Sequence, residues 1–256
     1  MTTRSESVDL LVGEQRIAGT FLAPDTQMPG LLFVHGWGGS QERDLKRARG
    51  IAGLGCVCLT FDMRGHAATL WQQQWVTRED NLRDIAVAYD LLARHPAIDR
   101  DGIAVVGSSY GGYLAAILTT LRPVKWLALR VPALYRDAEW TRPKRELDRD
   151  DLQLYRREPV SPEDNRALAA CARFRGDVLI VESEHDNLVP HATIMSYRGA
   201  FVRAHSLTHR IIDGADHALS GETCQQAYTA ILVNWVGEMV IGARVGNTAW
   251  GHALHG

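Results

Sequence analysis

The chain has 256 residues and a mass of 28.4 kDa, with 46% hydrophobic and 23% charged residues, which predicts a single globular domain over 1–256. A formal net charge of −2 gives no electrostatic basis for binding nucleic acid or an anionic membrane. The polar N-terminus lacks a secretory signal, and no run of about 18 uncharged apolar residues is present, so we expect a cytoplasmic protein.

Hydrophobic patterning predicts strands that alternate with helices along most of the chain. Residues 6–23 alternate between apolar and polar around a turn at Gly13-Glu14, which indicates an antiparallel hairpin. Short apolar runs typical of strands buried on both faces then alternate with segments of helical character. The strands are expected at 31–34, 57–61, 103–106, 126–131, 178–181 and 208–212, and the helices at 41–54, 79–94, 110–121, after Pro190 and at 222–241. This order predicts right-handed crossovers and a mainly parallel, twisted sheet with helices on both faces.

Two segments do not follow this pattern. In 134–175 the periodicity fades and charges of both signs crowd together, and we interpret the segment as a short helical lid insertion over the carboxyl edge of the sheet. Residues 243–256 show no pattern, so we expect a C-terminal tail that frays.

The four cysteines do not have the spacing of metal ligands or of a disulfide framework. Cys56 and Cys58 lie two residues apart in an apolar strand, where alternate residues share one face. Because free cysteine packs as a small hydrophobe, we expect all four thiols to be buried and reduced.

The most specific local signal is Gly107-Ser108-Ser109-Tyr110-Gly111, which follows an apolar strand and opens a helix. This strand-to-helix context is the one that the G-x-S-x-G nucleophile motif requires. The turn is so tight that residues two before and two after the serine must be small, and Gly107 and Gly111 meet that demand. We therefore predict Ser109 as a nucleophile.

A serine nucleophile needs a base whose tautomer is fixed by a third group. Asp186 follows the strand 178–181, and His217 follows the strand 208–212. The order serine, aspartate, histidine is that of α/β-hydrolases, and the three strand ends lie where ligands bind in such sheets. Asp186 is alternatively a helix N-cap, Glu182 and Glu184 are alternative acids, and the alternative histidines are His185, His191, His205 and His209.

Acyl transfer also needs hydrogen-bond donors for the oxyanion. They are conventionally the N–H after the nucleophile and an N–H from the loop after an early strand. These positions are Tyr110 and Trp37, the latter in the glycine-rich loop 35–39. An ordinary glycine-rich turn is the alternative interpretation of that loop.

Taken together, these segments resemble the α/β-hydrolase superfamily over nearly the whole chain. Gly-Ser-Ser-Tyr-Gly-Gly-Tyr-Leu-Ala-Ala at 107–116 is most similar to the prolyl-oligopeptidase, dienelactone-hydrolase and acyl-thioesterase-like branches. The further matching segments are 61–66, 84–92, 186–190 and 214–217. The resemblance implies an α/β-hydrolase fold and a catalytic triad of Ser109, Asp186 and His217.

The sequence departs from these relatives at several points. Ala67-Ala68 stands where relatives often have glycine and a small polar residue, and Glu182-Ser183 stands where His-Gly is usual. No segment is long enough for the β-propeller of the oligopeptidases, and serine replaces the cysteine of dienelactone hydrolases. Neither departure in the loops removes a catalytic group.

These residues predict a serine hydrolase of the carboxylesterase type that needs no metal and no organic cofactor. Its partner would be a small-molecule ester of small or medium acyl size, cleaved through an acyl-enzyme on Ser109. A thioesterase or acyltransferase, a small peptidase and a non-catalytic ligand-binding homologue are the alternatives. The sequence makes no prediction of oligomeric state.

The substrate pocket is expected to have an apolar wall of aromatic side chains, with packing between lid and body as the alternative. The candidates are Trp71, Tyr135, Trp140 and Tyr155, with Trp75 beside the first. Arg130 and the arginines of 134–175 are candidates for receiving an anionic substrate, although a run of mixed charges more often forms a solvated surface.

Overall fold

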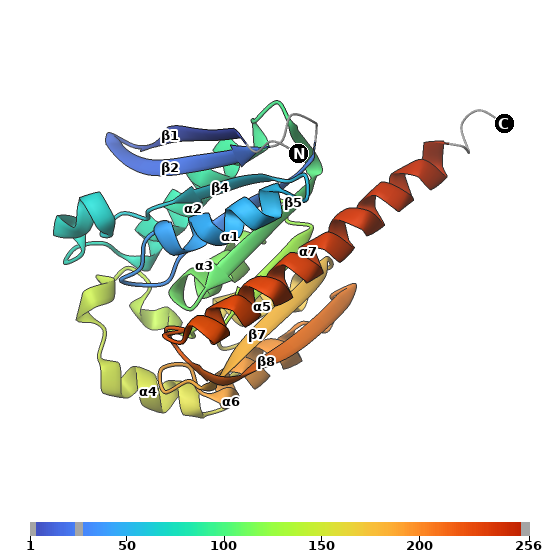
Figure 1. The fold of residues 1–256 in the computed structure, drawn as a ribbon. Helices are drawn as coiled ribbons and strands as arrows, with labels where there is room; N and C mark the ends of the chain where they lie inside the picture. Colours follow the sequence, from blue (N-terminus) through green and yellow to red (C-terminus); the bar gives the residue numbers. More distant parts are fainter. Residues whose placement is uncertain (1–3, 24–27, 252–256) are drawn as a thin grey trace.

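A twisted sheet forms the centre of the structure, a computed structural model that describes residues 4–23 and 28–251 (Figure 1). Within these residues the sheet has eight strands in the order β1-β2-β4-β3-β5-β6-β7-β8. They are β1 (Arg4–Val12), β2 (Gln15–Ala23), β3 (Met28–Val34), β4 (Val57–Phe61), β5 (Ile98–Ser108), β6 (Trp126–Arg130), β7 (Asp177–His185) and β8 (Ser206–Asp216). The pairs β1–β2 and β2–β4 are antiparallel and the others are parallel, which confirms the predicted sheet and N-terminal hairpin.

Helices cover both faces of this sheet (Figure 1). The helices are α1 (Glu42–Ala52), α2 (Arg78–Ala93), α3 (Tyr110–Leu118), α4 (Arg149–Arg157), α5 (Arg166–Arg173), α6 (His191–Ala200) and α7 (Glu222–Gly251), with short 3-10 turns η1 (Ala67–Gln72), η2 (Asp137–Glu139) and η3 (Lys144–Glu146). One hydrophobic core lies between the sheet and α1 with α7, and a second lies between the sheet and α2, α3, α5 and α6. None of the described helices is both long and apolar enough to cross a membrane.

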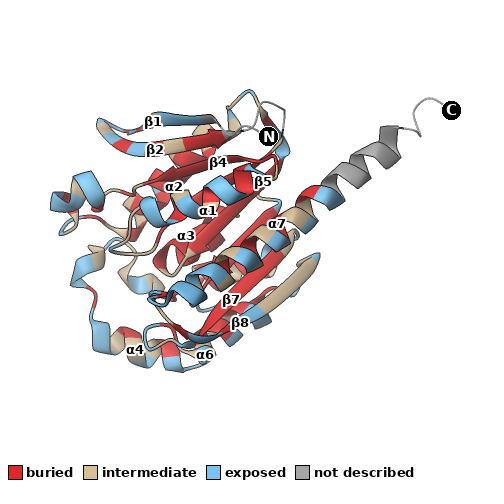
Figure 2. Ribbon diagram, viewed as in Figure 1, coloured by how far each residue is buried: buried red, intermediate tan, exposed pale blue. Residues whose placement is uncertain are grey.

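The central strands show why their sequences are continuously apolar. In β3, Leu31 and Phe33 pack toward α1 and α7, whereas Leu32 and Val34 pack toward α2 and α3. Successive side chains of a strand point to opposite faces, so a strand covered on both sides must be apolar at every position. Figure 2 shows these central strands as buried.

The inserted segment between β6 and β7 folds as η2, η3, α4 and α5. Asp148 caps α4 and Asn165 caps α5, because each carboxylate or amide oxygen accepts two backbone N–H groups of the first turn. Leu152 and Leu168 enter the larger hydrophobic core. As a result, α4 packs beside α6 and α5 packs against α3 (Figure 1).

The C-terminal helix differs from the sequence prediction. Helix α7 continues past the expected end at residue 241 to Gly251, so the expected unpatterned tail is wrong for 243–251. No proline interrupts the chain there. Once a helix has formed, extending it by one residue costs the conformational entropy of that residue alone and adds a backbone hydrogen bond. The remaining part of the predicted tail, 252–256, lies outside the described residues.

The cysteines are in no disulfide, and three of the four follow the prediction. Cys56, Cys58 and Cys171 are buried, and burial raises the pKa of the Cys58 and Cys171 thiols well above the ordinary value. Cys224 is only half-buried, which corrects the expectation for this residue. It lies in the first turn of α7, where it packs only in part against the smaller hydrophobic core.

Candidate active site

Ser109 occupies the sharp turn between β5 and α3. Its backbone has φ 52° and ψ −113°, a strained conformation for a residue other than glycine. Three backbone hydrogen bonds hold it: the Ser109 N–H donates to the Arg130 carbonyl at 2.8 Å, and the Ser109 carbonyl accepts from Tyr113 at 3.1 Å and Ala133 at 3.0 Å. The surrounding structure therefore fixes the strained turn that the sequence predicts.

The two flanking glycines are required by close backbone approach. A Cβ atom on Gly111 would lie 2.3 Å from the Val34 carbonyl oxygen, and one on Gly107 would lie 2.7 Å from the Gly111 carbonyl oxygen. Both distances are shorter than a carbon and an oxygen tolerate, so any side chain there would push β3, β5 and α3 apart.

The structure brings Ser109, His217 and Asp186 into one hydrogen-bonded chain, although they follow three different strands. His217 Nε2 lies 3.0 Å from Ser109 Oγ, and His217 Nδ1 lies 2.6 Å from Asp186 Oδ2. The Asp186 side chain is 2% exposed, and its other oxygen accepts the N–H groups of Leu188 and Val189, each at 2.8 Å. These contacts fix the carboxylate toward His217.

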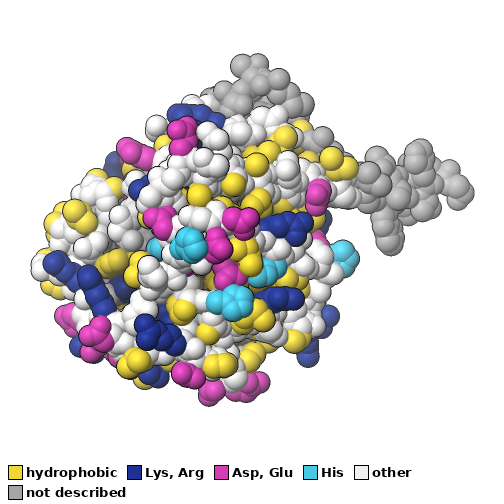
Figure 3. All heavy atoms as spheres, turned by 60° about the horizontal axis from the view of Figure 1, so that its bottom comes forward, with side chains coloured by type: hydrophobic (Ala, Val, Ile, Leu, Met, Phe, Trp, Pro, Cys, Tyr) yellow, Lys and Arg dark blue, Asp and Glu magenta, His cyan; other side chains and the backbone are white. Residues whose placement is uncertain are grey.

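The alternative acids and bases have other partners. Glu182 accepts from His191 Nδ1 at 2.7 Å and is paired with His209 Nε2 at 3.0 Å. Glu184 accepts the Gly214 N–H at 2.6 Å, and His205 Nδ1 lies 2.7 Å from Asp177. Figure 3 shows histidine and acidic side chains close together on the side of the molecule that it brings forward. Within the described residues, none of these alternative acids and bases has a hydrogen bond to Ser109, whose Oγ is bonded to His217.

Helix α4 supports the loop that carries Asp186. The Arg156 guanidinium donates to the carbonyls of Leu134 and Leu188, both at 3.0 Å, and Gln153 Nε2 donates to the Asn187 carbonyl at 3.2 Å. The inserted segment thus holds in place the loop that carries Asp186.

The glycine-rich loop 35–39 passes beside the nucleophile. A Cβ atom on Gly36 would lie 3.4 Å from Ser109 Cβ, and Gly38 has φ 75°, in the left-handed region that favours glycine. His35 holds the loop, because its Nδ1 lies 2.8 Å from the Gly36 carbonyl and its Nε2 accepts the Met63 N–H at 3.1 Å. Burial lowers the pKa of His35 from 6.5 to about 4, which matches a neutral ring that both donates and accepts.

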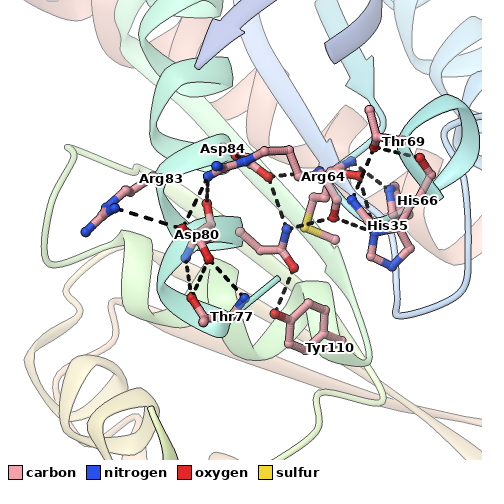
Figure 4. Close-up of polar contacts among 12 residues, drawn as sticks. His35, Arg64, His66, Thr69, Thr77, Asp80, Arg83, Asp84 and Tyr110 are labelled. Atoms are coloured by element: carbon pink, nitrogen blue, oxygen red, sulfur yellow. Dashed lines mark hydrogen bonds and ion pairs between the residues drawn. The ribbon is translucent and has the colours of Figure 1, made fainter. Parts of the chain in front are cut away.

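A buried polar network connects this loop region to the residue after the nucleophile (Figure 4). Tyr110 Oη donates to Asn81 at 3.0 Å, and Asn81 Nδ2 donates to Asp84 at 3.1 Å and to the Arg64 carbonyl at 3.0 Å. Arg64 Nε donates to Asp84 at 2.6 Å. The Trp37 ring contacts the Tyr110 ring edge to face at 5.4 Å, so both predicted oxyanion-hole residues are packed together.

His66 extends this network beyond Arg64. Its Nδ1 lies 3.1 Å from the Arg64 carbonyl, and its ring contacts those of His35 and Trp37. Burial and, to a smaller extent, the nearby His35 lower the pKa of His66 from 6.5 to about 4. Ala67, which follows, has φ 45°, so it adopts the left-handed conformation that favours glycine.

A pocket of about 510 Å³ opens beside Ser109. It is lined by residues of the glycine-rich loop, of α1, of η1 with the preceding His66, and of the carboxyl ends of β5, β6 and β8 with the residues that follow β8. Apart from the loop and the triad, the side chains that face it include Arg43, Asp44, Arg47, His66, Leu70, Arg130 and Leu219. The pocket therefore combines charged and polar side chains with apolar ones such as Leu70 and Leu219.

None of the four aromatic residues predicted for the substrate pocket lines it, and neither does any residue of 134–175. Trp71 is 67% exposed and contacts Trp75, whereas Tyr135 is buried against the rings of Tyr110 and Tyr113. Trp140 and Tyr155 face arginines outside the pocket, namely Arg166 at 4.0 Å and Arg136 at 4.6 Å. Tyr135 thus packs the insertion onto α3, whereas Trp140 and Tyr155 pack against arginines within the insertion, so the expected aromatic wall does not line this pocket.

Sequence reasoning missed the arginines of α1. Arg43 and Arg47 are four residues apart, a spacing that places them on one face of a helix. That face lies along the pocket, next to Arg130 of β6. The spacing was a signal in the sequence, but which way the face points depends on how α1 packs on the sheet.

Comparison with solved structures shows the same fold in several hydrolases. The dienelactone hydrolase from Anabaena variabilis ATCC 29413 is 18% identical, with 91% of this chain and 96% of that chain covered and a TM-score of 0.65. The 2,6-dihydroxy-pseudo-oxynicotine hydrolase is 16% identical, with 93% and 69% covered and a TM-score of 0.71. The Pyrococcus horikoshii acylaminoacyl peptidase is 14% identical, with a TM-score of 0.70, and 92% of this chain covers 41% of that one.

Comparison of sequences gives the family. No curated protein matches the chain. The profile of the prolyl oligopeptidase family matches residues 46–242, which include Ser109, Asp186 and His217. The chain therefore belongs to the prolyl oligopeptidase family of the α/β-hydrolase superfamily.

Proposed function

We propose that the protein is a serine hydrolase that cleaves a carboxylic ester of small or medium acyl size through an acyl-enzyme on Ser109. The observation that carries this proposal is the continuous chain from Ser109 Oγ through His217 to Asp186, at 3.0 and 2.6 Å. Distances of this size are those of a nucleophile, its general base and the group that orients the base.

The hydrogen bonds define the role of each group. Asp186 accepts the Nδ1 proton of His217, which leaves Nε2 free to take the proton of Ser109 as the oxygen attacks the carbonyl carbon. The backbone N–H groups of Trp37 and Tyr110 would hold the oxyanion. The imidazolium then gives its proton to the departing alcohol, and a water activated by His217 hydrolyses the acyl-enzyme.

Peptide hydrolysis is the second candidate, because the chain belongs to a family named for a peptidase. The same three residues serve both reactions, and the difference lies in the leaving group. A thioester would be cleaved by the same steps.

Labelling with a fluorophosphonate probe tests the nucleophile. We expect labelling of the wild type and complete loss in Ser109→Ala and His217→Ala, while Ser108→Ala, its neighbour in the same turn, stays labelled. A panel of 4-nitrophenyl esters, acyl thioesters and peptide 4-nitroanilides then ranks the three substrate classes. An unlabelled, folded wild type, or labelling that survives in Ser109→Ala, would contradict the proposal.

A further inference from the structure

The pocket beside Ser109 carries an excess of positive charge. Three of the residues that line it are arginines, Arg43, Arg47 and Arg130, and one is a carboxylate, Asp44. We call these three arginines the arginine cluster. Two of the other lining side chains, His35 and His66, are kept neutral by burial, so they do not change this balance at neutral pH.

Arg130 is built into the sheet next to the nucleophile. It ends β6, pairs with Ser108 of β5, and its carbonyl accepts the N–H of Ser109 at 2.8 Å. Ala128 of the same strand faces α1 and α7, so the period of two places the Arg130 side chain on that face as well. The guanidinium therefore has a fixed position relative to Ser109.

This guanidinium is buried without a carboxylate of its own. Arg130 is 8% exposed, and no ion pair involves it in the described part of the chain. It donates to the His217 carbonyl at 2.8 Å and lies 3.5 Å from Ser183 Oγ, which leaves further N–H donors for a ligand. A buried, unpaired cation is costly for a protein to keep, and an anionic ligand would offset that cost.

Arg47 and Arg130 contact the same tyrosine ring. The centre of the Tyr228 ring is 4.8 Å from the Arg47 guanidinium carbon and 5.8 Å from that of Arg130, so the ring brings the two cations into one cluster. Arg47 binds Asp44 at 3.2 Å, yet its Nε is buried and has no hydrogen-bond acceptor among the described residues. The cluster thus has donors that its protein neighbours do not satisfy.

We propose that the arginine cluster binds a carboxylate carried by the substrate, so that the protein acts on esters with an anionic group rather than on neutral ones. Guanidinium groups bind carboxylates through paired N–H donors, and two such groups that line one pocket and contact one ring, Arg47 and Arg130, can bind one anion together. The proposal rests on the proposed function for its substrate, while the anion site itself depends only on the arginines.

Matched pairs of esters test this proposal at low ionic strength. In the first pair the charge is in the acyl part: mono(4-nitrophenyl) adipate against its neutral methyl ester. In the second the charge is in the leaving group: 4-carboxyphenyl butyrate against 4-(methoxycarbonyl)phenyl butyrate. We expect kcat/KM to be roughly 10-fold to 100-fold higher for the charged member of one pair, as for a hydrogen bond to a charged group.

Variants assign the preference to the cluster. Arg47→Gln and Arg130→Gln should each reduce the ratio of charged to neutral kcat/KM at least roughly tenfold. Arg49→Gln, on the exposed side of the same helix, is the matched control and should keep the wild-type ratio. If Arg130→Gln does not fold, as judged by circular dichroism, Arg47→Gln alone decides. Equal kcat/KM within both ester pairs, or a ratio unchanged in the arginine variants, would overturn the proposal.

Calorimetric titration with monomethyl adipate separates this proposal from the proposed function. Binding that weakens in Arg47→Gln, in a protein that hydrolyses no ester, would sustain the anion site and reject Ser109 hydrolysis. Hydrolysis of neutral esters with equal kcat/KM within both ester pairs, and without binding of monomethyl adipate, would reject the anion site and sustain the hydrolase.

Discussion

Asp186 and Asp84 are both buried carboxylates near Ser109, and their partners differ. Asp186, with its side chain 2% exposed, faces the imidazole of His217, which can gain and lose a proton. Asp84, with its side chain 0% exposed, faces the guanidinium of Arg64, which stays charged. The Asp186–His217 pair can therefore take part in proton transfer. The Asp84–Arg64 pair cannot, and it instead supports the turn next to the glycine-rich loop.

The surroundings of the two carboxylates follow the same division. The Asp186 carboxylate is held by N–H groups of its own loop, and that loop is bound in turn by Gln153 and Arg156 of α4. Asp84 accepts from Arg64 and Asn81, and burial raises its pKa although Arg64 opposes this. Loss of Asp84 should therefore harm the fold, whereas loss of Asp186 should harm the reaction.

The largest expected effect is on activity, in Asp186→Asn. The amide can no longer hold His217 in the tautomer that accepts the serine proton, so kcat for a 4-nitrophenyl ester should fall about 10⁴-fold. The melting temperature, measured on the same sample, should change by no more than a few degrees. A kcat within tenfold of the wild type would show that Asp186 does not orient the base.

The second effect is on stability, in Asp84→Asn. Arg64 would keep a mostly buried charge with only the more distant Asp80 carboxylate, at 3.8 Å, as its partner, and the free energy of unfolding should fall by about 3 kcal/mol. Urea denaturation measures this change.

The same helix provides a matched control for that variant. Asp90 binds Arg122 through two hydrogen bonds of 2.6 and 2.7 Å, but the two side chains are 35% and 33% exposed. Asp90→Asn should therefore cost no more than about 1 kcal/mol. Equal losses in the two variants would show that burial does not distinguish the pairs.

The smallest effect is a pH dependence that comes from the histidines behind the loop. His35 and His66 have pKa values of about 4 in the folded protein against 6.5 ordinarily, because of burial. Between these values the unfolded chain binds more protons, so stability rises with pH from about 4 to 6.5 and falls on acidification. Each histidine contributes a slope of up to about 1.4 kcal/mol per pH unit.

The variant His66→Asn isolates this contribution. The Asn amide can still donate to the Arg64 carbonyl, but it does not titrate, so the slope of unfolding free energy against pH should decrease by up to that amount. His185→Asn, at a site 67% exposed, is the control and should leave the slope unchanged. Urea denaturation between pH 4 and 6.5 measures both, and equal slopes for all three proteins would contradict the assignment.

The order of strands and helices could be predicted from the sequence because it depends on neighbours along the chain. Apolar runs such as 57–61 are strands buried on both faces, and the structure has β4 at Val57–Phe61. The turn around Ser109 could also be predicted, since it requires Gly107 and Gly111 within two residues of the serine. The end of α7 was not, because no local signal stops that helix at 241.

Aromatic side chains were the least predictable part of the site. Tyr135 and Trp140 follow β6 in the sequence and stand close to the carboxyl edge of the sheet, which suggested a pocket wall. In the structure their rings pack against other rings and arginines of the insertion. An aromatic residue favours burial wherever apolar surface is available, so its type alone does not say which surface it covers.

The sequence by itself determined the alternating α/β order, the glycine-flanked Ser109 turn, and the order in which Asp186 and His217 follow it. These features are encoded in short segments and in strand ends that a parallel sheet must bring to one edge. Only the tertiary structure decided that Arg47 and Arg130 contact the same ring, that of Tyr228, and line the pocket beside the nucleophile. Three residues so far apart in the chain meet because α1 and α7 pack on the same face of the sheet, and that packing is a property of the whole core rather than of any local pattern.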